Sequence, residues 1–254
     1  MPPFRSIVQF VEFFHLALLS VLQVRLSQKH YVLKGGANLR YFCRSPRYSE
    51  DVDFDAAGIR PEKLEEKIDA VLSSRALAFV LRTHDMAIQR TSKPKPTPTT
   101  QRWKLMLAHS KSGEPIWTKV EFSHRGTDPR TSLDRVPDEI VSSYAVRPPT
   151  VMRYLPAAMI EQKIVALAGR TETQARDVFD LELLFRGWPD AVAPGTVPAK
   201  QLEAAAEGTM QLSFENYRAL VIRFLEPDAR ELYDRRETWD QMQSRVVEKL
   251  VALR

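Results

Sequence analysis

Two carboxylates one residue apart are the feature of this sequence best suited to chemistry. Asp51 and Asp53 lie in the segment Arg47-Tyr-Ser-Glu-Asp-Val-Asp-Phe54. Residues i and i+2 of a β-strand point to the same face of a sheet, so the two carboxylates would lie side by side. Carboxylate oxygens are suitable ligands for Mg²⁺. The spacing therefore predicts a magnesium site on a strand.

A pair of glycines precedes these acids. Gly35 and Gly36 lie in the segment Leu33-Lys-Gly-Gly-Ala-Asn-Leu-Arg40. A tight backbone turn beside paired acids can hold a nucleoside triphosphate together with its metal ions. The combination predicts nucleotidyl transfer. Arg47 and Ser49, from the segment of the acids, are further candidate NTP-binding residues.

A two-metal phosphoryl-transfer site commonly uses a third carboxylate. Glu121 is the best candidate, because it is an acid in the strand-like run Trp117-Thr-Lys-Val-Glu-Phe-Ser123. Asp55 is a weaker candidate, since it would lie at the end of the strand that carries the first two acids. A lone Asp-x-Asp pair is more often a solvated strand edge or a turn, and a lone strand glutamate is more often exposed. Only the combination indicates a site.

A second group of charged residues lies on two predicted helices further along the chain. Lys163 falls on the apolar face of the first, and an inward lysine costs free energy unless it meets an anion. The alternative is that its ammonium group reaches past the apolar edge to water. The side chain of Asp177 is also expected on the packed side of its helix. The two could pair with each other, or Lys163 could bind a triphosphate that Asp177 orients. Arg176 and Asp180 could simply be surface charges.

The composition indicates a globular protein. The chain has 254 residues, which is enough for one large or two small domains. Of these residues, 44% are hydrophobic and 27% are charged, which is typical of a globular protein. The single cysteine, Cys43, excludes an internal disulfide framework and fits a reducing compartment. The apolar run 13–22 is shorter than the roughly 20 residues of a membrane span. We therefore predict an amphipathic core helix over 6–26, no membrane association and a cytoplasmic location.

The positive charge is concentrated in one part of the chain. The formal net charge is +5, and residues 82–130 hold ten Lys and Arg against four Asp and Glu. Such a stretch attracts polyanions such as RNA, although a solvated basic surface is the alternative interpretation. Trp103 and Trp117 lie in the same stretch, and we expect both in the core rather than as stacking platforms.

The hydrophobic patterning predicts an α+β architecture with a helical C-terminal part. Strands are expected over 31–33, 51–55, 78–89, 101–108 and 116–123, helices over 37–43 and 61–74, and a Pro-rich connector over 91–100. Further helices are expected over 157–169, 174–186, 199–208, 213–225 and 228–252. These elements divide the chain into predicted domains of residues 1–150 and 151–254.

Five motifs occur in an order that resembles a known family. They are Lys34-Gly-Gly-Ala-Asn-Leu-Arg40, Arg47-Tyr-Ser-Glu-Asp-Val-Asp-Phe54, Val120-Glu-Phe122, Glu161-x-Lys163 and Arg176-Asp-Val-Phe-Asp-Leu181. The ordered set resembles the AbiEii-type toxin nucleotidyltransferases, a branch of the polymerase-beta-like superfamily. The resemblance runs from about residue 30 to residue 185.

The resemblance implies a nucleotidyltransferase domain with a mixed sheet, followed by a helical domain that contributes Lys163 and Asp177 to the site. It implies NTP as co-substrate and Mg²⁺ as cofactor. Proteins of this kind are usually toxins of bacterial toxin–antitoxin or phage-defence operons, so a cognate antitoxin is an expected partner. Several relatives add nucleotides to the 3′ acceptor end of tRNA, which blocks translation. RNA, and tRNA in particular, is therefore the expected acceptor.

The resemblance also implies roles for individual residues. Asp51 and Asp53 would be metal ligands, Gly35 and Gly36 would form the turn facing the triphosphate, Lys163 would contact phosphate and Asp177 would complete the site. The superfamily pattern has Gly-Ser at the turn, where this chain has Gly-Gly, as is usual in the AbiEii branch. Ser49 is the candidate to supply the hydroxyl instead. The third acid is less fixed in this branch, which affects the assignment of Glu121.

Two alternatives and one regulatory hypothesis accompany this interpretation. The same reaction could modify a protein or a small-molecule hydroxyl, or the chain could be a non-catalytic module that binds nucleotide or RNA. Phosphorylation of Ser49 would add close to two negative charges beside Asp51 and Asp53. It should repel the triphosphate and switch the enzyme off.

Overall fold

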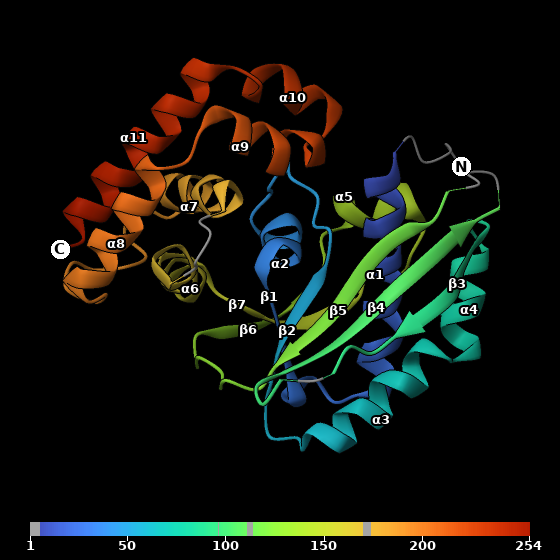
Figure 1. Ribbon diagram of the computed structural model, residues 1–254. Coiled ribbons are helices and arrows are strands. Elements are labelled where there is room, and N and C mark those ends of the chain that lie inside the picture. Colours follow the sequence, from blue (N-terminus) through green and yellow to red (C-terminus); the bar gives the residue numbers. More distant parts are fainter. Residues whose placement is uncertain (1–5, 96, 111–113, 170–173) are drawn as a thin grey trace. The chain divides into compact units, whose positions relative to one another are not determined.

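The computed structural model describes residues 6–95, 97–110, 114–169 and 174–254. The chain forms two compact units, which Figure 1 shows in the colours of the sequence. Unit 1 comprises Met1–Phe42 and Tyr48–Tyr154, and unit 2 comprises Cys43–Arg47 and Leu155–Arg254. Five residues that lie early in the sequence, 43–47, therefore belong with the C-terminal unit.

A mixed seven-stranded sheet forms the centre of unit 1 within its described residues. The spatial order is β3-β4-β5-β2-β1-β7-β6. The strands are β1 Tyr31–Lys34, β2 Val52–Ala56, β3 Met86–Ser92, β4 Thr100–His109, β5 Ile116–Ser123, β6 Thr131–Arg135 and β7 Thr150–Tyr154. The pairs β1–β7 and β2–β5 are parallel and the other pairs are antiparallel. This mixed sheet confirms the predicted fold class.

Unit 1 also contains helices, which are labelled in Figure 1. They are α1 Ile7–Arg25, α2 Gly35–Phe42, α3 Pro61–Leu72, α4 Arg75–Arg82 and α5 Asp138–Val141, with short 3₁₀ turns at Gln28–His30 and Ser142–Tyr144. Helix α1 packs against α3, α4, β5 and β7. Apolar side chains from these elements form one continuous core.

Helix α1 confirms the helix predicted over 6–26, but it is not amphipathic along its middle. Every side chain from 11 to 19 is buried. By length and composition α1 is apolar enough to cross a membrane, yet most of its apolar window is buried within the protein. It is packed as a core helix.

The polar residues of α1 are buried with partners. Glu12 accepts hydrogen bonds from Nε of Arg40 at 2.7 Å and from the hydroxyl of Tyr144 at 2.5 Å. Nε2 of His15 lies 2.8 Å from Oγ1 of Thr118. Because burying a charge or a polar group costs free energy unless it is paired, these contacts explain how α1 tolerates them.

The strand predicted over 78–89 is wrong in its first half. That segment lies within α4, and a strand begins only at Met86. Oγ of Ser74 accepts a hydrogen bond from the backbone N–H of Leu77 at 3.2 Å and so caps the helix. Leu77 and Leu81, four residues apart, are both buried, which is the spacing of one helix face. The Ser cap and this spacing were the signals for a helix.

Strands β6 and β7 were not predicted from the sequence. β6 forms an edge of the sheet, and its side chains are half-buried or exposed. An edge strand without a buried face carries little hydrophobic alternation, so its pattern is weak. The other predicted strands of unit 1 are confirmed as β1, β2, β4 and β5.

Unit 2 is helical. It contains α6 Pro156–Gly169, α7 Ala175–Gly187, α8 Ala199–Met210, α9 Phe214–Leu220, α10 Pro227–Tyr233 and α11 Arg236–Ala252, with a 3₁₀ turn at Ile222–Phe224. The helices predicted over 213–225 and 228–252 are each interrupted in the structure. The segment 43–47 joins this unit through the backbone, because Arg47 forms a β-bridge with Leu225 and N–H of Glu226 donates to the carbonyl of Pro46 at 2.9 Å.

Candidate active site

Asp53 and Glu121 lie opposite each other on the parallel strands β2 and β5. The same row continues on both sides, with Lys34 of β1 opposite Asp53 and Arg102 of β4 opposite Glu121. Four adjacent strands thus place two carboxylates between two cations on one face of the sheet. Asp51 directly precedes β2 and is two residues from Asp53, which puts it next to this row.

Basic side chains pair with two of the acids around this row. Nε of Arg102 donates to Oε2 of Glu121 at 2.6 Å. Nζ of Lys119 lies 2.8 Å from Oδ2 of Asp51. Glu121 and Asp51 therefore each have a cation within hydrogen-bonding distance.

Asp55, the weaker candidate, is buried and uses its carboxylate inside the unit. It accepts hydrogen bonds from Nζ of Lys34 at 2.5 Å and from the hydroxyl of Tyr154 at 2.8 Å. These contacts tie β2 to β1 and β7. Asp55 is therefore a structural residue in this arrangement.

The electrostatics of Asp53 differ from those of an ordinary surface acid. Burial, together with the negative charges of Asp51 and Glu121, raises the pKa of Asp53 to about 6, against the opposing effect of Lys34 and Lys119. Holding this group as a carboxylate at neutral pH costs free energy. A bound cation would remove that cost.

Gly35 is the first residue of α2 and approaches Asp53 closely. Its φ is +67°, a value that L residues with a side chain rarely adopt. A Cβ atom built on Gly35 would lie 2.9 Å from Oδ2 of Asp53. The glycine pair is thus not a separate turn, because Gly35 and Gly36 form the start of α2. The N–H groups at the first turn of a helix attract anions such as phosphate.

Ser49 is half-buried and bound to the backbone of an acid. Its Oγ donates a hydrogen bond to the carbonyl oxygen of Asp51 at 2.7 Å. The hydroxyl therefore fixes the chain where it enters β2. Its predicted contact with NTP and its role as a phosphosite stay predictions.

The donor set suits a hard divalent cation. Asp51 and Asp53 offer carboxylate oxygens from one strand face, which is the ligand type that Mg²⁺ prefers. Among the described residues, no three or more His, Cys, Asp or Glu side chains are already gathered as a metal-binding group. Asp51 and Asp53 are the residues that would hold a metal, and Glu121, whose Oε2 accepts from Arg102, is the third candidate.

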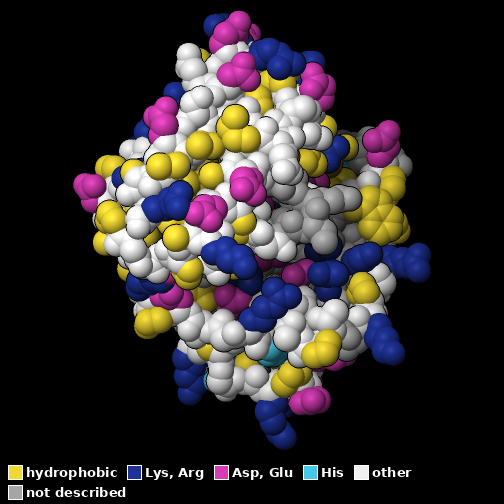
Figure 2. Space-filling view, turned by 60° about the vertical axis from the view of Figure 1, so that its left-hand side comes forward, with side chains coloured by type: hydrophobic (Ala, Val, Ile, Leu, Met, Phe, Trp, Pro, Cys, Tyr) yellow, Lys and Arg dark blue, Asp and Glu magenta, His cyan; other side chains and the backbone are white. Residues whose placement is uncertain are grey.

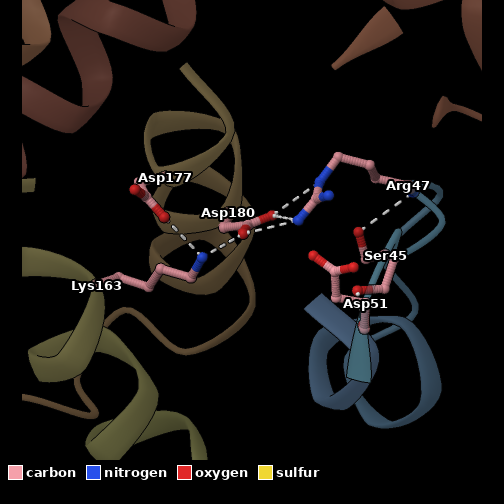
Figure 3. Close-up of polar contacts among 7 residues, drawn as sticks. Ser45, Arg47, Asp51, Lys163, Asp177 and Asp180 are labelled. Carbon is pink, nitrogen blue, oxygen red and sulfur yellow. Dashed lines mark hydrogen bonds and ion pairs between the residues drawn. The ribbon is translucent and has the colours of Figure 1, made fainter. Parts of the chain in front are cut away.

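A buried network of charges lies within unit 2, on α6, α7 and the segment 43–47 (Figure 3). Nζ of Lys163 lies 2.8 Å from Oδ1 of Asp177 and 2.5 Å from Oδ2 of Asp180. Nη2 of Arg47 lies 3.0 Å from each carboxylate oxygen of Asp180. Lys163 is therefore directed inward and paired with Asp177, which was one of the two alternatives from the sequence.

The structure excludes a surface position for Asp180, which the sequence left as a possibility, because this residue is fully buried. Burial opposes its ionised form, but the charges of Arg47 and Lys163 hold its pKa below the ordinary value. Conversely, the two aspartates raise the pKa of Lys163 against the effect of burial. The sequence did contain a signal, since residues i and i+3 of a helix share a face and Asp180 follows Asp177 at that spacing.

The two tryptophans of the basic stretch differ in exposure. Trp103 is in the core, where its Nε1 donates to Oδ1 of Asp69 at 2.7 Å. Trp117 is 57% exposed, so its expected place in the core is wrong. It lies on β5, four residues from Glu121 and on the same face.

The α+β fold with its row of sheet carboxylates is that of a nucleotidyltransferase, and comparison with known proteins gives the family. The sequence profile described as "Nucleotidyl transferase AbiEii toxin, Type IV TA system" matches residues 17–252. The chain belongs to this family, and it is an NTP-dependent nucleotidyltransferase of the toxin class. A type IV toxin–antitoxin system implies an antitoxin as partner.

Two of the solved structures that share this fold are from Helicobacter pylori. JHP933 from Helicobacter pylori is 18% identical with a TM-score of 0.60, and the alignment covers 98% of this chain and 95% of that one. A putative nucleotidyltransferase from H. pylori is also 18% identical with a TM-score of 0.62, and the alignment covers 99% of each chain. No curated protein matches the sequence significantly.

Proposed function

We propose that this toxin uses Mg²⁺ to transfer a nucleoside monophosphate from an NTP to the 3′ end of RNA, with the acceptor end of tRNA as the substrate. The transfer takes place in the cytoplasm and blocks translation. The observation that carries the proposal is the register that sets Asp53 against Glu121, next to Asp51 and the start of α2. It combines oxygen ligands for a cation with helix N–H groups for a phosphate.

In the reaction, the 3′-hydroxyl oxygen forms a bond to the α-phosphorus of the NTP. The bond from that phosphorus to the bridging oxygen of the β-phosphate breaks, pyrophosphate leaves with the electron pair, and the hydroxyl proton passes to water. Magnesium bound by Asp51 and Asp53 would neutralise charge on the triphosphate and on the leaving pyrophosphate. Gly35 leaves the space for Asp53, and Ser49 holds the backbone of Asp51.

The charge of the sheet strands supports a polyanionic acceptor. Arg102, Lys104 and Lys119 lie on β4 and β5 within the basic stretch 82–130. Figure 2 shows that Lys and Arg side chains on the face in view stand beside Asp and Glu side chains. Arg102 and Lys119 are each paired with a carboxylate and Lys104 is exposed, so these three side chains are suited to contact phosphates locally.

The predicted phosphate contact of Lys163 is part of the proposal. Its ammonium group is bound by Asp177 and Asp180, so the three residues act as a unit. We expect Lys163→Met to raise the KM for NTP more than it lowers kcat. A folded Lys163→Met protein with unchanged KM for NTP would assign Lys163 a structural role only.

The first experiment tests reaction and acceptor together. Purified protein is incubated with Mg²⁺, total tRNA and each α-³²P-labelled NTP in turn. We expect a labelled tRNA band with one preferred NTP, and no band for Asp51→Ala. The matched control is Asp138→Ala, which removes an exposed acid of the same unit and should leave labelling unchanged.

The other outcomes select among the alternatives. Labelling by Asp51→Ala at the rate of the unmodified protein would refute the metal assignment. Absence of label in every lane would favour a protein or small-molecule acceptor. With the right acceptor present, the enzyme would then still release pyrophosphate from the NTP. Binding of RNA without turnover of any NTP would favour the non-catalytic alternative.

A further inference from the structure

Strands β3, β4 and β5 have one buried face and one open face. On the buried face lie core side chains such as Trp103, Leu105 and Val120. On the opposite face Trp117 is 57% exposed, and Lys104 and Arg90 are exposed as well. An exposed tryptophan among basic side chains is unusual for a strand, because aromatic residues are normally used for packing.

The register orders the open face into three rows, each two residues from the next. They are Arg90–Met106–Trp117, Ser92–Lys104–Lys119, and Arg102–Glu121–Asp53. The first row offers apolar and aromatic surface beside an arginine. The second offers two ammonium groups, and the third is the row of the candidate active site.

The middle row contains an arrangement that costs stability. Lys104 and Lys119 are direct partners across β4 and β5. Like charges directly opposite each other in a sheet are destabilising. Nζ of Lys119 is partly compensated by Asp51 at 2.8 Å, and Lys104 is exposed. A bound phosphate would relieve the remaining repulsion.

We propose that this open face of β3, β4 and β5 binds the single-stranded 3′ segment of the acceptor RNA. A base stacks on Trp117, with Met106 beside it, and the adjoining phosphates contact Lys104 and Lys119. The 3′-hydroxyl then lies at the row of Asp53. Aromatic stacking combined with a basic track is the way in which sheet surfaces bind single strands. The inference rests on the proposed function and names the track on which its substrate lies.

The spacing sets the length of this segment. Trp117 and Glu121 are four residues apart on β5, which corresponds to about 13 Å at the rise of a β-strand. That distance is roughly four nucleotides at the spacing of a stacked strand. A paired end with a shorter overhang cannot reach from the carboxylates to the indole ring.

Binding is measured by fluorescence anisotropy with a 5′-labelled, unstructured oligouridylate and the full-length protein. Loss of one base stack corresponds to about 5- to 150-fold weaker binding, which we expect for Trp117→Ala. Trp117→Phe should bind nearly as well as the unmodified protein, because a phenyl ring still stacks. Phe79→Ala, which removes an exposed aromatic residue from α4, is the matched control and should have no effect.

The phosphate contacts are tested by salt dependence. Lys104→Gln should weaken binding and lower the slope of log K against log salt by about one contact. Lys63→Gln, an exposed lysine of α3, should leave the slope unchanged. Equal slopes for Lys104→Gln and the unmodified protein would overturn the phosphate contact.

Transfer to RNA hairpins with lengthened 3′ tails gives the second readout. Relative to the unmodified protein, Trp117→Ala should lose progressively more transfer activity as the tail lengthens to about four nucleotides. If RNA is labelled but Trp117→Ala is normal in binding and transfer, the inference fails and the proposed function stands. If no RNA is labelled but binding depends on Trp117, the proposed function fails and the RNA-binding face stands.

Discussion

A Cβ atom on Gly35 would lie 2.9 Å from Oδ2 of Asp53. This close approach links the first residue of α2 to the central carboxylate of β2. Two independent constraints therefore favour glycine as the first residue of α2. They are the positive φ of this residue and the space that the carboxylate of Asp53 occupies.

We expect Gly35→Ala to lower nucleotidyl transfer on the order of 100-fold, because the methyl group displaces the Asp53 carboxylate. The positive φ alone should cost about 1–2 kcal/mol of stability. Gly58→Ala is the matched control, since Gly58 has a φ of +58° and its added Cβ would meet its nearest atom only at 4.0 Å. Gly58→Ala should lose similar stability and keep activity. Equal activities of the two variants would contradict the role of the contact.

Asp53 should make stability depend on pH in the absence of Mg²⁺. The unfolded residue loses its proton near pH 4, whereas the folded residue loses it near pH 6. Between these values the folded state binds more protons, so the free energy of unfolding falls as pH rises, by up to about 3 kcal/mol. Asp53→Asn should remove this loss and abolish transfer.

Urea unfolding at a series of pH values, with and without Mg²⁺, measures the effect of Asp53. Mg²⁺ should stabilise the protein more at pH 7 than at pH 5, because it binds the ionised carboxylate. An Asp53→Asn protein that is less stable than the unmodified one above pH 6, in the absence of Mg²⁺, would argue against the electrostatic cost.

His15 should contribute in the opposite direction. Burial lowers the pKa of His15 to about 3. Oγ1 of Thr118 donates its proton to the carbonyl of Glu50 at 2.8 Å, so Nε2 of His15 is the donor to Thr118. The unfolded state alone takes up a proton below pH 6.5, and stability is therefore full above that pH and falls with acidification. We expect a loss of about 2 kcal/mol between pH 6.5 and pH 5.

The matched variant for this pH dependence is His15→Gln, which can still donate to Thr118 but does not titrate. Thermal or urea unfolding from pH 7 to pH 5 should give it a flatter profile than the unmodified protein. Parallel profiles would show that His15 is not the group responsible.

Asp180 should be the most sensitive acid of unit 2. Its removal leaves the buried cations of Arg47 and Lys163 without their shared partner. Breaking a buried ion pair from one side typically costs about 3–5 kcal/mol. We expect Asp180→Ala to lower the free energy of unfolding by this amount. Asp228→Ala, at an exposed acid of α10, should cost almost nothing, and similar losses for both variants would contradict the assignment.

Two substitutions of Ser49 distinguish a role in positioning Asp51 from a role in regulation. Ser49→Ala loses one hydrogen bond to the backbone of Asp51, worth about 1 kcal/mol, and should retain most of the transfer activity. Ser49→Asp adds a negative charge beside Asp51 and should lose activity, because the charge repels the triphosphate. Full activity of Ser49→Asp would refute the phosphorylation hypothesis.

Much of the local structure followed from the sequence, because the periodicity of apolar residues is a local property. Alternation around Val52 and Phe54 placed Asp51 and Asp53 on one strand face, and the spacing on α6 directed Lys163 inward. The order of the motifs identified the family. Where the local pattern was weak or mixed, as in α4 and β6, the prediction failed.

The tertiary structure decided which distant residues meet and which sheet face stays open. Asp53 and Glu121 are 68 positions apart, and only the pairing of β2 with β5 sets them in register. A period of two residues shows that Trp117 and Glu121 share a face, but not whether helices cover that face. Likewise, Asp180 is buried because residues from α6 and the segment 43–47 surround it. The pairing of strands and the covering of a sheet face by other elements depend on the whole chain, so no local sequence pattern predicts them.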